Sequence, residues 1–191
     1  MRTATDLKER IVAKAGDLFI EQGYVRTTNK HIADAVGSTT ASLYYYFPNG
    51  KKQLLREVAL AHVTEVTAMF ASLQDAQSLP ELLQQLSATA IKTMPLVAGR
   101  MSWLHAEFHH VDEEDKVFVR QQMLKIHSGI KALLARFISD KKAAHQLAWF
   151  LMGSAMGHFI LFDKMGMSAV EPNFDRQQMF QVVMRSIGLP R

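Results

Sequence analysis

The sequence predicts an all-α protein, with a small N-terminal helical module followed by a larger helical body. Apolar residues recur at steps of three and four along most of the chain, which is typical of amphipathic helices. No segment shows the sustained apolar and polar alternation, rich in β-branched residues, that marks a strand. The five prolines are sparse and leave residues 99–171 free of proline. The 191 residues suffice for one ordinary domain, or for a module of about 50 residues on a larger body.

Composition excludes several classes of protein. Hydrophobic residues make up 48% and charged residues 21%, so the chain is expected to fold rather than stay disordered. Cysteine is absent, which excludes disulfides, thiolate metal sites and a cysteine nucleophile. No apolar run approaches the roughly 18–20 residues of a membrane span, and the charged N-terminus lacks the apolar core of a signal peptide. We therefore expect a cytoplasmic protein without a membrane partner.

Positive charge is concentrated in the first third of the chain. Residues 1–60 carry nine Lys and Arg against six Asp and Glu, a balance of +3, which leaves +1 of the net +4 for the remaining residues. This modest excess is what a nucleic-acid-binding end would show.

Capping and stop signals predict four helices in the N-terminal third. Thr3 and Asp6 form a possible capping box before the first helix, and Gly23 ends it. Thr28 is placed as the N-cap of a short second helix, and Gly37 follows its end. A third helix must finish before Pro48. The second, third and fourth helices are predicted over residues 28–36, 39–47 and about 51–72.

The rest of the chain is also predicted to be helical. We expect a helix over about 79–93, a broken stretch around Pro95 and Gly99, and a short helix over 101–110. Longer helices are predicted over 113–139 and 141–166, and a last one over 173–187. The helix over 141–166 is apolar almost all the way round, so a second subunit is expected to cover part of it. The predicted division is a first domain of residues 1–50 and a second of residues 51–191.

The second and third predicted helices have the features of a helix-turn-helix pair. Ala33 is small enough for a close helix crossing, and Gly37, four positions later, tolerates the positive φ of a tight turn. Apolar side chains at helical spacing would seal the pair: Ile32, Val36, Leu43 and Phe47. The exposed face of the later helix carries short polar and aromatic side chains that can enter a DNA groove, namely Thr39, Thr40, Ser42, Tyr44 and Tyr45.

Residues 7 to about 60 resemble the DNA-binding domain of the TetR/AcrR family of bacterial transcriptional regulators. The matching motifs are Leu18-Phe19-x3-Gly23-Tyr24, Thr27-Thr28, Ile32-Ala33-x3-Gly37, Leu43-Tyr44-x-x-Phe47 and Lys51-Lys52-x-Leu54. Three features depart from the family pattern. Ser38 replaces a usually apolar residue, Ala41 stands where glycine is common, and one residue is added between Phe47 and Lys51. Ser38 is expected to weaken the seal between the helices slightly and can alter the base preference.

The resemblance implies a ligand-responsive repressor that acts as a homodimer on a double-stranded DNA operator, with no enzymatic activity and no cofactor. Thr28 would bind a phosphate, and Thr39 and Thr40 would touch base edges or the first phosphate. The three tyrosines Tyr44, Tyr45 and Tyr46 would bind phosphates and thymine methyl groups. Lys51 or Lys52 would clamp the DNA backbone at the start of a long helix that connects the module to a regulatory body.

Two further sets of residues are predicted in the regulatory body. A small apolar or amphipathic effector would bind among apolar, methionine and histidine side chains at helical spacing. This set is Met101, Leu104, His105, Phe108, Met123, His127, Phe150 and Met156. The dimer would form where small residues allow close helix approach across a two-fold axis. This second set is Trp149, Gly153, Met156, Gly157 and Ile160. A filled core without an effector is the competing interpretation of the first set.

Two rival functions rest on other features. His105 and His109 share a helix face, and with His110 they could hold a metal ion in a helical enzyme. However, Ala106 stands where the metalloprotease pattern requires glutamate, so no metal site and no catalytic residue is predicted. The other rival is a helical adaptor that binds proteins. The acidic run over residues 112–115 is interpreted as the N-terminal turn of a helix, where the macrodipole favours negative charge.

Overall fold

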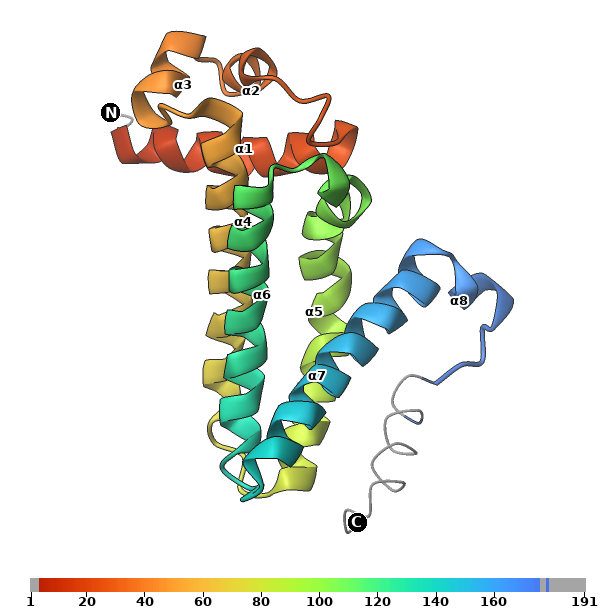
Figure 1. Cartoon of the computed structure of the whole chain (residues 1–191). Coiled ribbons are helices and arrows are strands. Elements are labelled where there is room, and N and C mark those ends of the chain that lie inside the picture. The colour runs from red at the N-terminus through yellow and green to blue at the C-terminus, as the bar shows by residue number, and fades with distance from the viewer. Residues whose placement is uncertain (1–3, 176–177, 179–191) are drawn as a thin grey trace. The chain divides into compact units, whose positions relative to one another are not determined.

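The computed structural model describes residues 4–175 and residue 178, and within these it contains helices and no strand (Figure 1). In this described part, seven α-helices of at least seven residues follow one another: α1 (Ala4–Gln22), α2 (Asn29–Ala35), α3 (Thr40–Tyr46), α4 (Gly50–Met69), α5 (Leu79–Glu107), α6 (Glu113–Leu134) and α7 (Lys141–His158). Short 3₁₀ turns follow α4 and α5, over Phe70–Leu73 and Phe108–His110. The predicted all-α class and the predicted starts of α2 and α3 are confirmed.

One prediction about helix α5 was wrong. The break expected around Pro95 and Gly99 does not occur, because α5 is continuous from Leu79 to Glu107. A proline inside a helix removes a single backbone hydrogen bond, and the remaining bonds and the tertiary contacts of a long helix can outweigh that cost of about 3 kcal/mol. The position of a proline alone was therefore not enough to predict a break in this helix.

The two long helices that follow are shorter than predicted. Helix α6 ends at Leu134 rather than near residue 139. The carboxylate of Asp140 caps α7 by accepting hydrogen bonds from the backbone N–H groups of Lys142 (2.8 Å) and Ala143 (3.2 Å). Helix α7 ends at His158 and passes into a π-helical turn, Phe159–Lys164, followed by the short helix α8 (Met167–Val170). Most of the helix predicted over 173–187 lies outside the described residues.

The chain divides into two compact units, and each draws on separated stretches of sequence. The first consists of residues 1–64 and 99–123, and the second of residues 65–98 and 124–191. These limits differ from the predicted domains of residues 1–50 and 51–191, which divide the chain by expected function. The first unit therefore includes the last turns of α5 and the first turns of α6 together with the helix-turn-helix pair.

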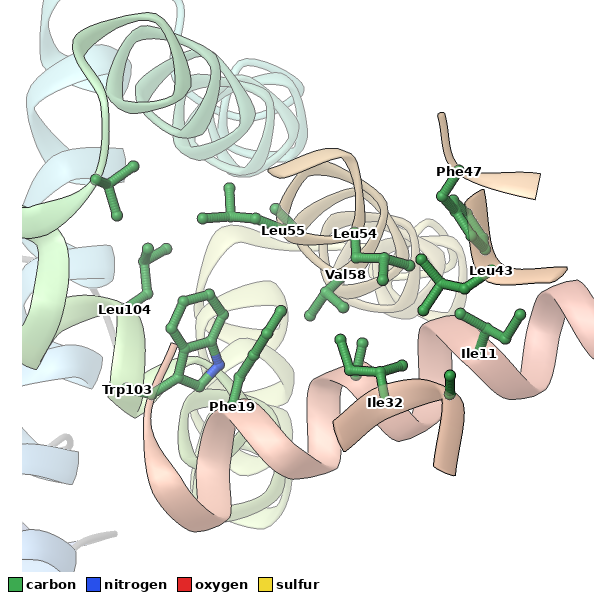
Figure 2. Close-up of a cluster of buried hydrophobic side chains, with 14 of the residues drawn as sticks. Ile11, Phe19, Ile32, Leu43, Phe47, Leu54, Leu55, Val58, Trp103 and Leu104 are labelled. Atoms are coloured by element: carbon green, nitrogen blue, oxygen red, sulfur yellow. The ribbon is translucent and has the colours of Figure 1, made fainter. Parts of the chain in front are cut away.

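The core of the first unit continues from the helix-turn-helix pair into α5 and α6 (Figure 2). Ile11, Phe19, Ile32, Leu43 and Phe47 are fully buried, as the helical spacing predicts. The same cluster contains four apolar residues that lie much later in the sequence: Trp103, Leu104, Val111 and Val119. The N-terminal module is therefore stabilised partly by side chains from residues 99–123.

The second unit has buried apolar side chains in its parts of α5 and α6, in α7 and in the turns that follow α4 and α7, but none in α8. They are Leu73, Ala76, Leu82, Leu83, Ile126, Ile130, Leu133, Leu134, Ala144, Ala148 and Phe159. The guanidinium of Arg136, just after α6, donates to the carbonyls of Leu73 (3.3 Å) and Ala76 (2.8 Å). This contact ties the end of α6 to the connection between α4 and α5. No helix in the described part of the chain is both long and apolar enough to cross a membrane.

Candidate nucleic-acid interface

Helices α2 and α3 form the close crossing that the sequence predicts. Ala33 is fully buried, and its carbonyl accepts a hydrogen bond of 2.9 Å from the backbone N–H of Ser38. Between the helices, Gly37 has φ +67°, a left-handed conformation that favours glycine. Ile32 and Leu43 are buried on the inner sides of the pair. The short connection fixes the exposed face of α3 relative to α2.

Two hydroxyl groups at the helix caps, those of Thr28 and Ser42, leave their protons available at this face. The Thr28 hydroxyl oxygen accepts a hydrogen bond from the backbone N–H of His31 (3.1 Å), so its own proton is not used in the cap. The Thr39 hydroxyl accepts from the backbone N–H of Ser42 and donates to the Ser42 hydroxyl, both at 3.1 Å. The Ser42 proton is thus not used in that contact. Thr28 and Ser42 can each donate to an acceptor such as a phosphate oxygen.

The three consecutive tyrosines of α3 differ in exposure. Tyr45 is 81% exposed and Tyr44 is 45% exposed, whereas Tyr46 is half-buried against the core of the first unit. The ring of Tyr45 meets the ring of Tyr46 edge to face, with centroids 5.1 Å apart. Tyr44 and Tyr45 therefore present aromatic surface and hydroxyl groups to solvent, while Tyr46 also anchors the helix.

Lys51, predicted as a phosphate clamp, makes contacts within the protein. Its ammonium donates to the carbonyls of Tyr24 (2.8 Å) and Val25 (3.3 Å), and it lies 4.3 Å from the centroid of the Tyr24 ring. Burial lowers the pKa of Lys51, opposed by the nearby Glu107 carboxylate. Burial, together with Asp115 and Asp112, raises the pKa of Tyr24 to about 12. Lys51 holds the turn after α1 against the start of α4.

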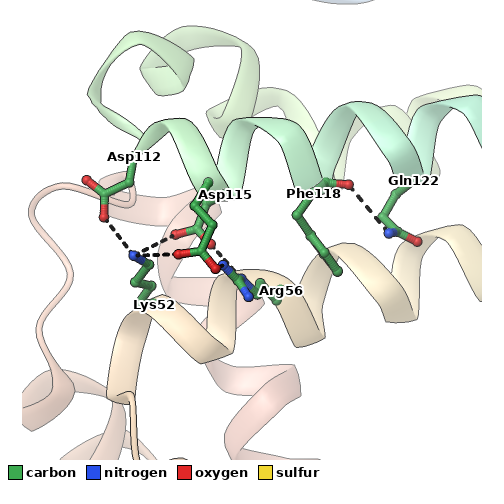
Figure 3. Close-up of polar contacts among 7 residues, drawn as sticks. Lys52, Arg56, Asp112, Asp115, Phe118 and Gln122 are labelled. Carbon is green, nitrogen blue, oxygen red and sulfur yellow. Dashed lines mark hydrogen bonds and ion pairs between the residues drawn. The ribbon is translucent and has the colours of Figure 1, made fainter.

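Lys52 belongs to a cluster of ion pairs between α4 and the start of α6, which we call the α4–α6 joint (Figure 3). Its ammonium lies 3.1 Å from an Asp112 carboxylate oxygen, 3.6 Å from Glu114 and 3.9 Å from Asp115. Arg56, one turn later, pairs with Glu114 at 2.8 Å and with the buried carboxylate of Asp115. The predicted acidic first turn of α6 is present, and it also binds two cations of α4.

These contacts give both lysines a structural role beside the one predicted. The hydrogen bond to Asp112, and the nearby acidic charges, raise the pKa of Lys52. A phosphate that binds either lysine must share its ammonium with the groups already in contact. The assignment of Lys51 and Lys52 as a phosphate clamp stays a prediction.

The α4–α6 joint is expected to weaken in acid. The hydrogen bond from Arg56, and the charges of Arg56 and Lys52, hold the pKa of Glu114 below its usual range. A carboxyl with a lower pKa in the folded state stabilises the fold above its unfolded pKa of about 4.3 and loses this effect as pH falls through the folded value. Glu114→Gln should therefore lower the melting temperature at neutral pH, with a difference from wild type that vanishes in acid. Melting curves between neutral pH and pH about 3 test this, with Glu21→Gln on α1 as control; an unchanging difference would contradict it.

The end of α5 supplies two contacts that sequence analysis missed. The Glu107 carboxylate accepts a hydrogen bond from the backbone N–H of Val25 (3.0 Å) and lies directly against Gly23, where φ is +86°. The Trp103 ring stacks on Tyr24, with centroids 5.8 Å apart, and lies 4.9 Å from Phe19. Glu107 thus binds the turn between α1 and α2. The only signal in the sequence for the burial of Trp103 is its helical spacing from other apolar residues of α5.

The predicted effector-binding residues are distributed over both units. Leu104 is buried and Phe108 half-buried in the core of the first unit, whereas His105 is exposed. Met123 belongs to the first unit, and Phe150 and Met156 belong to the second. In the second unit, the buried His127 stacks on Trp149 with centroids 4.3 Å apart, and its Nε2 lies 3.3 Å from the His145 carbonyl. The side chain of Met101 is not among those described.

The histidines behind the rival enzyme hypothesis are exposed. His105, His109 and His110 are all exposed, and the ring centroids of His109 and His110 lie 3.9 Å apart. Among the described residues, no three His, Cys, Asp or Glu side chains are grouped so that they could hold a metal ion. This arrangement offers no support for the metal-dependent enzyme.

The predicted dimer residues lie on an open face of α7 and the turn that follows it. A Cβ atom added at Gly153 or Gly157 would meet no described atom within 4 Å. Nearby, Trp149 is 38% exposed and Ile160 is 42% exposed, and Met156 is half-buried. The glycines therefore do not serve close packing within the described part of this chain, and the predicted interface stays a prediction.

Comparison with known proteins identifies the region that contains the exposed face of α3. Residues 11–58 match the model of "Bacterial regulatory proteins, tetR family". Over 52 residues the chain is 44% identical to the HTH-type transcriptional regulator LmrA of Bacillus subtilis (strain 168), a match that covers 27% of this chain and 28% of LmrA. The chain thus spans less than a third of the length of the curated relatives it matches.

Solved structures share the fold over nearly the whole chain. One is a putative transcriptional regulator from Saccharomonospora viridis in complex with choline, which is 20% identical, covers 98% of this chain and 100% of its own, and has a TM-score of 0.73. Another is the TetR family transcriptional regulator PfmR from Thermus thermophilus, with 18% identity, 95% and 100% coverage, and a TM-score of 0.67. At these identities the likeness establishes the fold alone.

Proposed function

We propose that this chain, which belongs to the tetR family of bacterial regulatory proteins through residues 11–58, is a transcriptional regulator that binds a DNA operator in the cytoplasm. The observation that carries the proposal is the exposed face of α3. It combines hydroxyl groups and aromatic rings on a helix whose opposite side is buried in the core of the first unit. Such a face fits the major groove, where hydroxyls and rings meet base edges, thymine methyls and phosphates.

The regulator would act as a homodimer on a palindromic operator. Helix α3 has seven residues, and a single helix of this length buries too little surface for useful specificity. Two copies related by a two-fold axis double the contact and read two half-sites. The open glycines of α7 and the exposed apolar side chains beside them support an interface formed by α6 and α7.

Binding to DNA is tested by selecting duplexes from a random-sequence pool and titrating the enriched duplex against a scrambled one at several salt concentrations. The enriched duplex should bind far more tightly, with an affinity that falls as salt rises. Neither a helical enzyme nor a protein-binding adaptor should select one sequence. Equal affinity for both duplexes would refute the proposal.

Thr40→Ala is expected to weaken binding to the enriched duplex by roughly 5- to 100-fold, the usual effect of losing one base contact. Thr40 is the first residue of α3 and follows the capping Thr39, so its loss leaves the helix cap in place. Dimerisation and circular dichroism should therefore match those of wild type. Ser72→Ala, which removes an exposed hydroxyl of the second unit, is the control and should change no affinity. Unchanged selectivity in Thr40→Ala would remove this residue from the interface.

A small apolar or amphipathic effector would regulate the operator affinity and release the repressor. The proposal is supported by the structural role of residues 99–123, because the same stretch that completes the core of the DNA-binding unit also continues into the regulatory helices α5 and α6. A shift of either helix would reach the helix-turn-helix pair through Trp103, Glu107 and the α4–α6 joint. Thermal-shift screening of hydrophobic acids, phenols and lipophilic cations, followed by a DNA-release assay, tests it. A compound that stabilises the fold without changing operator affinity would contradict the coupling.

A further inference from the structure

We propose that Asn29 is a positioning residue for operator binding, which orients the Tyr44 hydroxyl so that it donates its proton to a DNA phosphate oxygen. The inference rests on the proposed function and adds a residue that neither the helix pattern nor the family motifs single out. Asn29 is the first residue of α2, directly after the capping Thr28. Its side-chain Nδ2 donates a hydrogen bond of 2.8 Å to the hydroxyl oxygen of Tyr44 on α3.

On its other side, the Asn29 amide packs against Gly50. Its carbonyl oxygen Oδ1 is buried, and no donor in the described part of the chain reaches it. The amide lies against the Cα of Gly50, where an added Cβ would approach Nδ2 to 2.6 Å and Oδ1 to 2.9 Å. Gly50 has φ +55° at the first residue of α4. The side chain of Asn29 therefore occupies the point where the ends of α2, α3 and α4 meet.

Glycine at position 50 makes this arrangement possible. Any larger residue would place its Cβ on the amide of Asn29, and it would also be strained at this positive φ. The residue follows the Pro48-Asn49 turn, where the sequence departs from the usual family spacing by one residue. The added residue between Phe47 and Lys51 is therefore in the same loop as the glycine that Asn29 contacts.

The direction of the hydrogen bond decides what Tyr44 can offer to DNA. An amide nitrogen only donates, so the Tyr44 oxygen is the acceptor in this contact and its hydroxyl proton is left for another partner. Tyr44 is 45% exposed, which leaves room for that partner on the solvent side. Phosphate oxygens only accept hydrogen bonds, so they match a hydroxyl held in this state. The Asn29 donor also polarises the hydroxyl and strengthens its donation.

Asn29→Asp is the informative variant, because an ionised carboxylate only accepts hydrogen bonds. The Tyr44 hydroxyl would then donate to residue 29 and have no proton for a phosphate. The added negative charge also repels DNA, so each change at position 29 is measured with Tyr44 and again in the Tyr44→Phe background. The charge acts in both backgrounds, whereas the hydrogen bond acts only when the hydroxyl is present.

The measurement is the affinity of each variant for the duplex enriched by the wild-type protein, with melting temperature and circular dichroism recorded for each. Tyr44→Phe should weaken binding about tenfold, as expected for a hydrogen bond to a charged group. Asn29→Ala should weaken it about three- to tenfold when Tyr44 is present, and by less than about twofold in the Tyr44→Phe background. The loss of duplex affinity caused by Asn29→Asp should be about tenfold larger with Tyr44 present than in the Tyr44→Phe background.

Equal effects of Asn29→Ala and Asn29→Asp in the two backgrounds would overturn the inference, because they would reflect charge or fold stability instead. A merely structural Asn29 would lower the melting temperature without coupling to Tyr44 in DNA affinity. If the wild-type protein enriches no sequence, the proposed function fails and this inference fails with it. If it enriches one but the coupling is absent, only the role of Asn29 is refuted.

Discussion

Replacing Trp103 with alanine is expected to lower the free energy of unfolding by about 3–5 kcal/mol, the usual cost of truncating a buried tryptophan. Trp103 is 5% exposed and packs against both Phe19 and Tyr24, although it is separated from both by some eighty residues of sequence. Its loss would leave a cavity in the core of the first unit. Urea denaturation followed by circular dichroism at one fixed protein concentration measures the change.

The matched control for this prediction is an exposed aromatic ring in the same unit. Tyr45 is 81% exposed on α3, so Tyr45→Ala should cost much less, about 1 kcal/mol or less. Near-equal losses in the two variants would show that Trp103 contributes no more than an exposed ring. In that case α5 would not help to stabilise the helix-turn-helix pair.

Gly157→Arg is expected to convert the dimer to a monomer or to an insoluble protein. The open space around Gly157 suits close approach of a second helix, and an arginine side chain would fill that space and bury an unpaired charge. Burying an unpaired charge in an interface costs several kcal/mol, which would raise the dissociation constant by about a thousandfold or more. Sedimentation velocity over a concentration series measures the oligomeric state.

Gly99→Arg is the matched control, because it makes the same chemical change at another helical glycine with no described atom near its Cβ. This variant should remain dimeric if the interface involves α7 and not that part of α5. Gly157→Ala should keep the dimer or weaken it only slightly. A soluble and fully dimeric Gly157→Arg protein would place the interface elsewhere.

Local signals in the sequence were sufficient for the helix-turn-helix pair. Thr28 was predicted as a cap, and it accepts the expected hydrogen bond from a backbone N–H group. Gly37 was predicted in the tight turn, and its φ is positive. Such features depend on residues within four positions of one another. A short stretch of sequence therefore contains all the residues that determine them.

Contacts between distant segments could not be predicted in the same way. Lys52 was assigned to phosphate from its place in a motif, but its nearest charged partners follow some sixty residues later at the start of α6. Glu107 and Val25 are likewise distant in sequence and joined by a hydrogen bond. The continuity of α5 through Pro95 depends on the hydrogen bonds and tertiary contacts of the whole helix, which outweigh the cost of one proline. A single sequence contains no signal for these pairings.

The central claim is that two copies of α3 bind one operator through a two-fold dimer. Hydroxyl-radical footprinting of the wild-type protein on the enriched duplex tests it most directly. We expect two protected half-sites of inverted sequence, with centres about one DNA turn apart, or roughly 34–36 Å. A single protected site, or protection without inverted symmetry, would contradict the claim.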